Sequence, residues 1–237
     1  MKLAWLTLAF AVLAALLLGG SGAGVRLALW EFPTGFEILR WSAYLGLAAS
    51  ACALVLLTIP STRTRRLPHL FAALVLGLGV AYVPWNFLQQ ARTAPPIHDI
   101  TTDTDDPPAF SAVIPLRAGA QNPIEYGGRE VADLQRRGYP DIAPLILATA
   151  PDAAFRKALD AANQMGWAVV SADATTGRIE ATATTPWFGF KDDIAIRLTS
   201  VATGSRIDVR SLSRVGGSDI GTNAKRVRAY LAKLAAA

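Results

Sequence analysis

Three apolar runs near the N-terminus constrain the fold more than any other feature of the sequence. They cover residues 3–20, 41–59 and 67–88, and none of them has an Asp, Glu, Lys or Arg inside it. About 20 apolar residues are enough to cross a hydrocarbon core about 30 Å thick. The sequence therefore predicts three transmembrane helices within residues 1–92, with the lipid bilayer as their partner.

The first run also resembles a cleaved signal peptide. Lys2 precedes it, and Ser21, Gly22 and Ala23 form a small-residue cleavage site. The length of the run and the two runs that follow it favour a retained helix.

Charges in the connecting loops predict the orientation. Arg63, Arg65 and Arg66 lie in the short connection between the second and third runs. Lys and Arg are enriched in cytoplasmic loops, so this connection is expected inside. An odd number of spans then places everything after Arg92 outside.

The net charge of +5 comes from the membrane region alone. Residues 1–94 hold seven basic and two acidic residues, whereas residues 95–237 hold 16 of each kind. The basic balance therefore reflects membrane topology, and the outer part has no excess positive charge for binding nucleic acid. We expect no nucleic-acid partner.

Cysteine and histidine are too scarce for several kinds of chemistry. The lone cysteine, Cys52, lies in the second apolar run, and the histidines are His69 and His98. A structural zinc site and a Ser-His-Asp triad both need histidine or cysteine in the folded domain. We therefore expect no metal, no cofactor and no disulfide in the outer domain.

The outer part is expected to form an α+β domain after a linker. Residues 93–108 are polar and rich in proline, which is typical of an extended linker. Within residues 109–237, helical spacing predicts helices near residues 150–165 and after Ser218. A short helix is also expected near residues 129–137. Alternating patterns predict hairpins from residues 167–184 and 193–210. The expected fold is an antiparallel four-stranded sheet with two helices packed on one face.

Alternation along these strands predicts one buried and one wet face. The buried set is Ile179, Ala181, Ile194, Ile196, Leu198, Ile207 and Val209. The set expected to face water is Arg178, Glu180, Asp193, Arg197, Arg206, Asp208 and Arg210.

Several segments of the outer part resemble the bacterial family called domain of unknown function 1499. They read "PPIHDITTDTDDPPAF", "YPDIAPL", "MGWAVVSADATTGRIEATATTPWFGFKDDIAIRL" and "IDVRSLSRVGGSDIGTNAKRVRAYL". The resemblance runs from Pro95 to about Leu234 and does not include the apolar runs. It implies a membrane-associated protein of the cell envelope, and it implies no established activity.

The basic stretch around Gly216 and Gly217 is the first candidate site. Arginines that converge on the start of a helix can bind a phosphate or carboxylate, since free backbone N–H groups also favour an anion there. The candidate residues are Arg197, Arg210, Arg214, Ser218, Asp219, Asn223 and Arg226. The alternative is structural, because Ser218 and Asp219 are good capping residues and Arg226 suits the solvated side of a helix.

Two further groups of residues stand out. Trp187 and Phe190 form an aromatic edge that either stacks on a ligand or closes the core. The acidic residues of the linker, with His98, leave three interpretations open: pairing with arginines of the domain, a solvated linker, or a weak calcium site. These residues are His98, Asp99, Asp103, Asp105 and Asp106.

The favoured hypothesis is a multi-pass protein of the bacterial inner membrane with a periplasmic C-terminal domain. The domain is expected to bind an anionic envelope component or a protein partner and to have no catalytic role. Changing Arg210 and Arg214 to Ala is then expected to abolish binding with little loss of stability. The alternatives are an envelope hydrolase that uses Asp103, Asp192 or Asp219, and an accessory subunit whose helices pack through Gly77 and Gly79.

Overall fold

The computed structural model describes residues 2–236 and divides them into two compact units. The first, called the helical unit below, contains the chain up to Gln90 together with Pro186–Gly189. The second, called the sheet domain below, contains the rest of the described chain.

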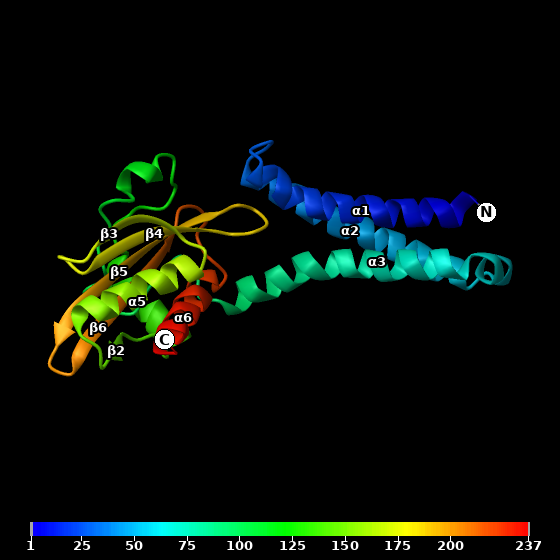
Figure 1. Ribbon diagram of the computed structural model, residues 1–237. Helices are drawn as coiled ribbons and strands as arrows, with labels where there is room; N and C mark the ends of the chain where they lie inside the picture. The colour runs from blue at the N-terminus through cyan, green and yellow to red at the C-terminus, as the bar shows by residue number, and fades with distance from the viewer. Residues whose placement is uncertain (1, 237) are drawn as a thin grey trace. The chain divides into compact units, whose positions relative to one another are not determined.

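Three long helices make up the helical unit: α1 (Lys2–Arg26), α2 (Phe32–Leu57) and α3 (Pro60–Thr93) (Figure 1). Each is long and apolar enough to cross a membrane, as the three apolar runs predict. Most of their large apolar side chains are exposed, which suits contact with lipid.

Small residues allow α2 and α3 to approach closely. A Cβ atom added to Gly77 would lie 2.3 Å from the carbonyl oxygen of Gly46 and 2.3 Å from the Ser50 hydroxyl. Ser50 also donates a hydrogen bond to the carbonyl of Leu74 at 3.1 Å. Gly79 has no neighbour within 4 Å of such an atom. Close packing therefore depends on Gly77 and not on Gly79.

The start of α3 is kinked at Arg66, where φ is −137° and ψ is 15°. Pro68 follows two residues later, and a proline inside a helix removes a backbone hydrogen bond and clashes with the preceding turn. Residues 60–65 therefore form a short turn of helix that points away from the axis of the remaining helix (Figure 1).

The sheet domain has the following elements in chain order: β1 (Asp99–Thr101), η1 (Ile114–Arg117), α4 (Gly128–Gly138), β2 (Leu145–Leu147), α5 (Pro151–Gln164), β3 (Ala168–Asp173), β4 (Arg178–Thr184), β5 (Lys191–Val201), β6 (Gly204–Ser213) and α6 (Thr222–Ala235). The two hairpins, the helices α5 and α6 and the short helix α4 are the elements that the sequence predicts. Left-handed glycines end some of these elements, such as Gly166 after α5 with φ of 72°.

The sheet has six antiparallel strands, so the expected number of four was wrong. The order is β1-β6-β5-β4-β3, and β2 pairs with β6 beside β1. Both additional strands are three residues long, too short to show an alternating pattern. β1 comes from the stretch expected as an extended linker, and Asp99 pairs with Leu212 in the register.

The predicted buried set lies in the main core of the sheet domain. Each of its residues is at most 7% exposed. Side chains of α5, such as Phe155, and of α6, such as Val227 and Tyr230, belong to the same apolar cluster. The Tyr230 ring stacks on Trp167 with 4.9 Å between centroids, and its hydroxyl donates to the carbonyl of Ala158 at 2.8 Å.

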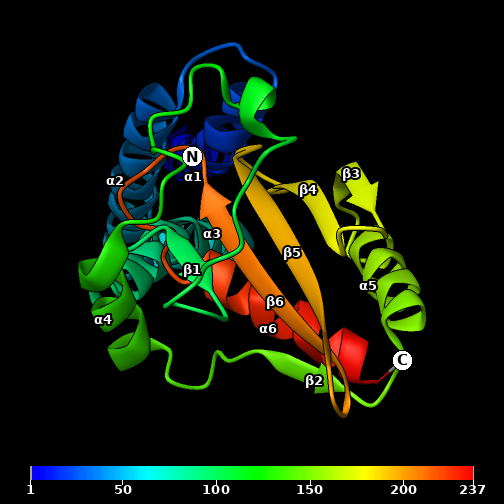
Figure 2. The ribbon, with the colours of Figure 1, turned by 90° about the vertical axis from the view of Figure 1, so that its left-hand side faces the viewer.

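The opposite face of the sheet is covered, and the expectation that it faces water was wrong. Glu180, Asp193, Asp208 and Arg210 on this face are at most 3% exposed. The chain between β1 and α4 crosses this face, and Figure 2 shows that coil in front of the sheet with α6 behind it. The sheet is therefore enclosed on both sides along much of its length.

Candidate functional site

The polar residues of the covered face were the strongest candidates for a site. Phe110 and Val113 of the crossing chain pack against Ala195 and Leu212 of the sheet. Beside this apolar contact, the Glu180 carboxylate accepts hydrogen bonds from the Ser111 and Val113 backbone N–H groups at 2.9 and 3.0 Å. The crossing chain is thus fixed by apolar packing and by a buried carboxylate.

Arg210 lies on this face and forms hydrogen bonds with three residues of the same chain. Its guanidinium donates to both oxygens of Asp99 on β1, at 3.0 Å and 2.7 Å. It also donates to the carbonyls of Pro108 and Ile124. The Phe110 and Tyr126 rings lie 4.9 and 5.5 Å from it, close enough for cation–π attraction. The hydrogen bonds use four of its five N–H donors, and the side chain is only 4% exposed, so Arg210 is not open to an external anion.

Tyr126 is affected by the same ion pair. Burial and the nearby Asp99 carboxylate raise the pKa of Tyr126 to about 12. Its hydroxyl is buried and has no hydrogen-bond partner within the described chain. The phenol therefore stays neutral across the physiological range and contributes its ring to the contact with Arg210.

A second buried carboxylate, Asp193, binds two arginines. Arg117 at the end of η1 donates to it at 2.6 Å, and Arg214 donates at 3.0 and 2.7 Å. Arg214 also donates to the carbonyl of Leu116 at 2.5 Å. Asp193 is fully buried, and these two arginines compensate its charge there. They also hold η1 against the sheet.

Arg197 and Arg206 form the third ion-paired group on this face. Arg197 contacts Asp106 at 2.7 Å and Asp208 at 3.3 Å, and Arg206 contacts Asp103 at 2.7 Å. Asp105, the remaining carboxylate of the linker cluster, binds Arg136 of α4 at 2.5 Å. The acidic cluster is therefore paired with arginines of the sheet domain, which is one of the three interpretations left open by the sequence.

The other predicted site residues lie on the opposite face, at the start of α6. Asp219 accepts hydrogen bonds from the backbone N–H groups of Gly221 and Asn223 at 2.9 and 2.6 Å. It thus caps α6, and burial raises the pKa of its carboxyl although these bonds oppose the rise. Ser218 makes a weaker contact, accepting from the N–H of Ile220 at 3.2 Å.

Asn223 and Arg226 join α6 to the sheet. Asn223 accepts from the Ser211 hydroxyl at 2.8 Å and donates to the Ser213 hydroxyl at 2.9 Å. Arg226 donates to Asp192 at 2.5 Å, and their side chains are 10% and 5% exposed. These residues stabilise the packing of α6 against the sheet. Side chains alternate along β6, so Ser211 and Ser213, which Asn223 contacts, point to the face opposite Arg210.

The structure therefore does not bring the predicted anion site together. Arg197, Arg210 and Arg214 lie on the covered face, whereas Ser218, Asp219, Asn223 and Arg226 lie on the α6 side. All three arginines of the covered face are paired with carboxylates of the same chain.

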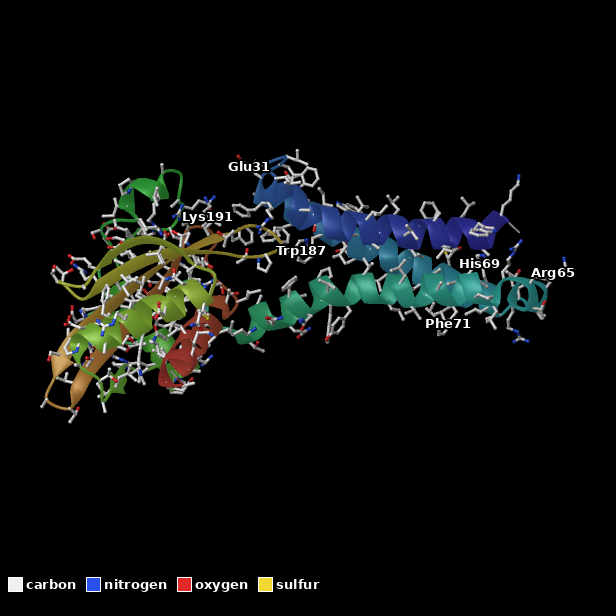
Figure 3. The ribbon with its side chains drawn as sticks, in the orientation of Figure 1. Glu31, Arg65, His69, Phe71, Trp187 and Lys191 are labelled. Carbon is white, nitrogen blue, oxygen red and sulfur yellow. The ribbon has the colours of Figure 1, made fainter. Side chains whose placement is uncertain are left out.

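Trp187 and Phe190, the predicted aromatic edge, belong to different units. Trp187 is part of the helical unit, where its indole N–H donates to the carbonyl of Gly19 at 3.2 Å (Figure 3). Its ring lies 6.0 Å from that of Phe87. The backbone N–H of Phe190, in the sheet domain, donates to the Thr185 hydroxyl at 2.9 Å.

A hollow between α5 and α6 was not predicted. It has a volume of about 540 Å³ and is lined by Lys157, Asp160, Ala161, Gln164, Lys233 and Ala236. Lys233 donates to the Gln164 side chain at 3.0 Å, and Lys157 has no ion pair among residues 2–236. The spacing of Lys157, Asp160 and Gln164 along one face of α5 was the available signal.

The residues that fix the covering chain were also missed. Arg117, Glu180 and Gln135 carry no local motif. Gln135 of α4 accepts from the Thr101 N–H at 3.0 Å and donates to the Thr101 carbonyl at 2.6 Å, so it pairs with the outer edge of β1. Only the three-dimensional arrangement shows these contacts.

Comparison with known proteins agrees with the sequence resemblance. A search of the curated proteins finds no significant match. The family model described as protein of unknown function (DUF1499) matches residues 99–234, which contain every strand of the sheet. The chain belongs to the DUF1499 family, and three helices capable of crossing a membrane precede its family domain.

Proposed function

We propose that this protein is a multi-pass protein of the bacterial inner membrane whose DUF1499 domain binds an anionic envelope component on the periplasmic side, without catalysing a reaction. Three apolar helices support the membrane location. The orientation rests on the positive charges between α2 and α3. The family adds no activity of its own to this proposal.

The hollow between α5 and α6 is the observation that carries the binding proposal. Its volume of about 540 Å³ lies within the range of small-ligand sites. Lys157 and Lys233 are both half-buried there, so each side chain is partly held by the lining of the hollow. A phosphate or carboxylate between them would gain two charge-assisted hydrogen bonds. Asp160 on the same lining favours a ligand that also carries hydroxyl or amine groups.

The carboxylates proposed for a hydrolase are already engaged, which supports a role in binding. Asp192 binds Arg226, Asp103 binds Arg206, and Asp219 caps α6. Asp103 and Asp192 also lie on opposite faces of the sheet. A glycosidase needs two carboxyl groups about 5 to 9.5 Å apart on either side of a substrate.

The test is binding by the full-length protein in nanodiscs. Soluble probes are a phosphorylated disaccharide and a carboxylate-bearing peptidoglycan fragment, measured by calorimetry. Lys157→Ala with Lys233→Ala is expected to weaken binding on the order of 10- to 100-fold, since each charged hydrogen bond contributes roughly 1.5 kcal/mol.

The matched control removes the same charge from α4. Arg129→Ala with Arg137→Ala changes two exposed side chains and is expected to leave the affinity unchanged. If both double variants weaken binding equally, the loss of affinity comes from the change in net charge and not from the hollow. Unchanged affinity in the lysine variant would exclude the hollow as the binding site.

A further inference from the structure

The start of α3 and the start of α1 form one end of the helical unit. The Trp5 and His69 rings are in contact, with 4.3 Å between their centroids. Figure 3 shows Arg65 and His69 at this end and Glu31 at the other. We call Lys2, Arg63, Arg65 and Arg66, the cations at this end, the basic cluster.

The basic cluster has no acidic counterpart. The segment 2–93 contains two acidic residues, Glu31 and Glu37, and Glu37 pairs with Arg40 in α2. None of the four cations forms an ion pair within the described part of the chain. Four like charges therefore lie at one end of the helical unit without a carboxylate of the described chain to compensate them, and their summed field attracts an anion.

Two nitrogen atoms at the same end lack a hydrogen-bond partner, and one of them, the Arg66 Nε, is always a donor. The Arg66 Nε and the His69 Nδ1 are buried and have no hydrogen-bond partner among residues 2–236. A buried donor without an acceptor costs about 1–3 kcal/mol. Orientation of the helices by positive charge would need only exposed cations, and so it does not explain a desolvated guanidinium nitrogen.

Exposed apolar side chains continue from the basic cluster along α3. Leu67 is 50% exposed and Phe71 is 60% exposed, directly after the kink at Arg66. The kink turns residues 60–65 away from the axis of α3, so Arg63 and Arg65 lie on a turn distinct from the spanning part (Figure 3). A cationic turn beside an apolar helix face matches the two parts of a phospholipid.

We propose that the basic cluster binds the phosphate of an anionic phospholipid, whose acyl chains lie along Leu67 and Phe71. The headgroup oxygens would accept hydrogen bonds from the arginines and supply the missing acceptor for Arg66. The apolar neighbours distinguish this site from one for free phosphate, which has no acyl chain to place.

The test is lipid retention by the full-length protein purified in detergent from mixed anionic and zwitterionic membranes. Native mass spectrometry counts the bound anionic phospholipids, and titration into nanodiscs gives the affinity. Arg63→Gln with Arg65→Gln and Arg66→Gln is expected to lower affinity on the order of 100-fold. This follows from about 1 kcal/mol for each basic residue near an anionic surface.

The control variant combines Arg92→Gln, Arg129→Gln and Arg137→Gln, which remove the same charge elsewhere. It is expected to retain anionic phospholipid as the unchanged protein does. A third variant replaces the cluster arginines by lysines, which keeps the charge but removes the planar guanidinium; its affinity is expected to lie between the other two.

Three outcomes would overturn the proposal. The first is equal retention by the glutamine variant and the control, with both folded by circular dichroism. The second is equal retention of zwitterionic and anionic lipids by the unchanged protein. The third is binding of inorganic phosphate as tight as that of the phospholipid, which would show a free-anion site.

Discussion

Arg210 is placed so that its loss should weaken the whole sheet domain. Its side chain is 4% exposed and pairs with the equally buried Asp99. Removing one partner of a buried ion pair leaves the other charge without compensation, which typically costs 3–5 kcal/mol. Arg210→Ala is therefore expected to lower the free energy of unfolding by about that amount, measured by denaturant titration. This reverses the expectation from sequence that the substitution has little effect on stability.

The control for Arg210→Ala is Arg129→Ala, which removes an arginine from an exposed ion pair. The Arg129 side chain is 94% exposed, and its carboxylate partner is 3.8 Å away, so its loss should change stability by less than about 0.5 kcal/mol. A similar loss in the two variants would contradict the role assigned to the buried pair. Asp99→Ala should destabilise the domain as Arg210→Ala does, and the double variant less than the sum of both.

Residue patterns in the sequence predict which side chains face the core but not what covers the other face. The alternation along β5 correctly predicts that Ile194 and Ile196 face the core and that Asp193 and Arg197 face the other side of the sheet. Polar residues in such a pattern usually mean water, yet Asp193 is fully buried. Its partner Arg117 lies 76 residues earlier in the chain, and no local signal links the two.

The contact between α2 and α3 depends on Gly77 and on Gly46, which faces it, and not on Gly79. A side chain at position 77 would collide with the Gly46 carbonyl and the Ser50 hydroxyl, whereas one at position 79 meets nothing within 4 Å. Gly77→Val is expected to separate α2 from α3 and to lower thermal stability in detergent by several degrees. Gly79→Val should leave the melting temperature nearly unchanged.

The pair of valine variants is matched in volume, hydrophobicity and distance from the loops. A melting temperature lowered equally by both would show that helix propensity, and not contact with α2, decides the result. The sequence could name both glycines as candidates for close packing. It could not choose between them, because that choice depends on the rotation of α3 about its axis.

Element predictions succeed where the pattern is long and fail where it is short. The helices α5 and α6 and the hairpins β3–β4 and β5–β6 follow from periodicity over several residues. β1 and β2 are three residues each, and their pairing with β6 arises from tertiary contacts. The candidate site was predicted less well than the elements. The sequence shows the same arginines whether they bind an external anion or a carboxylate of the same chain, such as Asp99.

At the scale of the whole molecule, the orientation in the membrane can be tested directly. A reporter active only outside the cytoplasm, fused after residue 237, is expected to be active because three spans precede it. The same reporter fused after Ile59 follows two spans and is expected to be inactive. The measurement is reporter activity in cells at equal protein amounts. The opposite pair of results would place the sheet domain in the cytoplasm.

The pairing of β1 with β6 has a consequence for biosynthesis. Asp99 leaves the ribosome 111 residues before the arginine that neutralises it. Until β6 has been made, β1 has no strand to pair with, and the covering chain has no surface to pack on. Closure of such distant contacts is slow, so the early half of the domain waits in an unfolded state. We therefore expect this segment to be accessible to chaperones and proteases until β6 has been made.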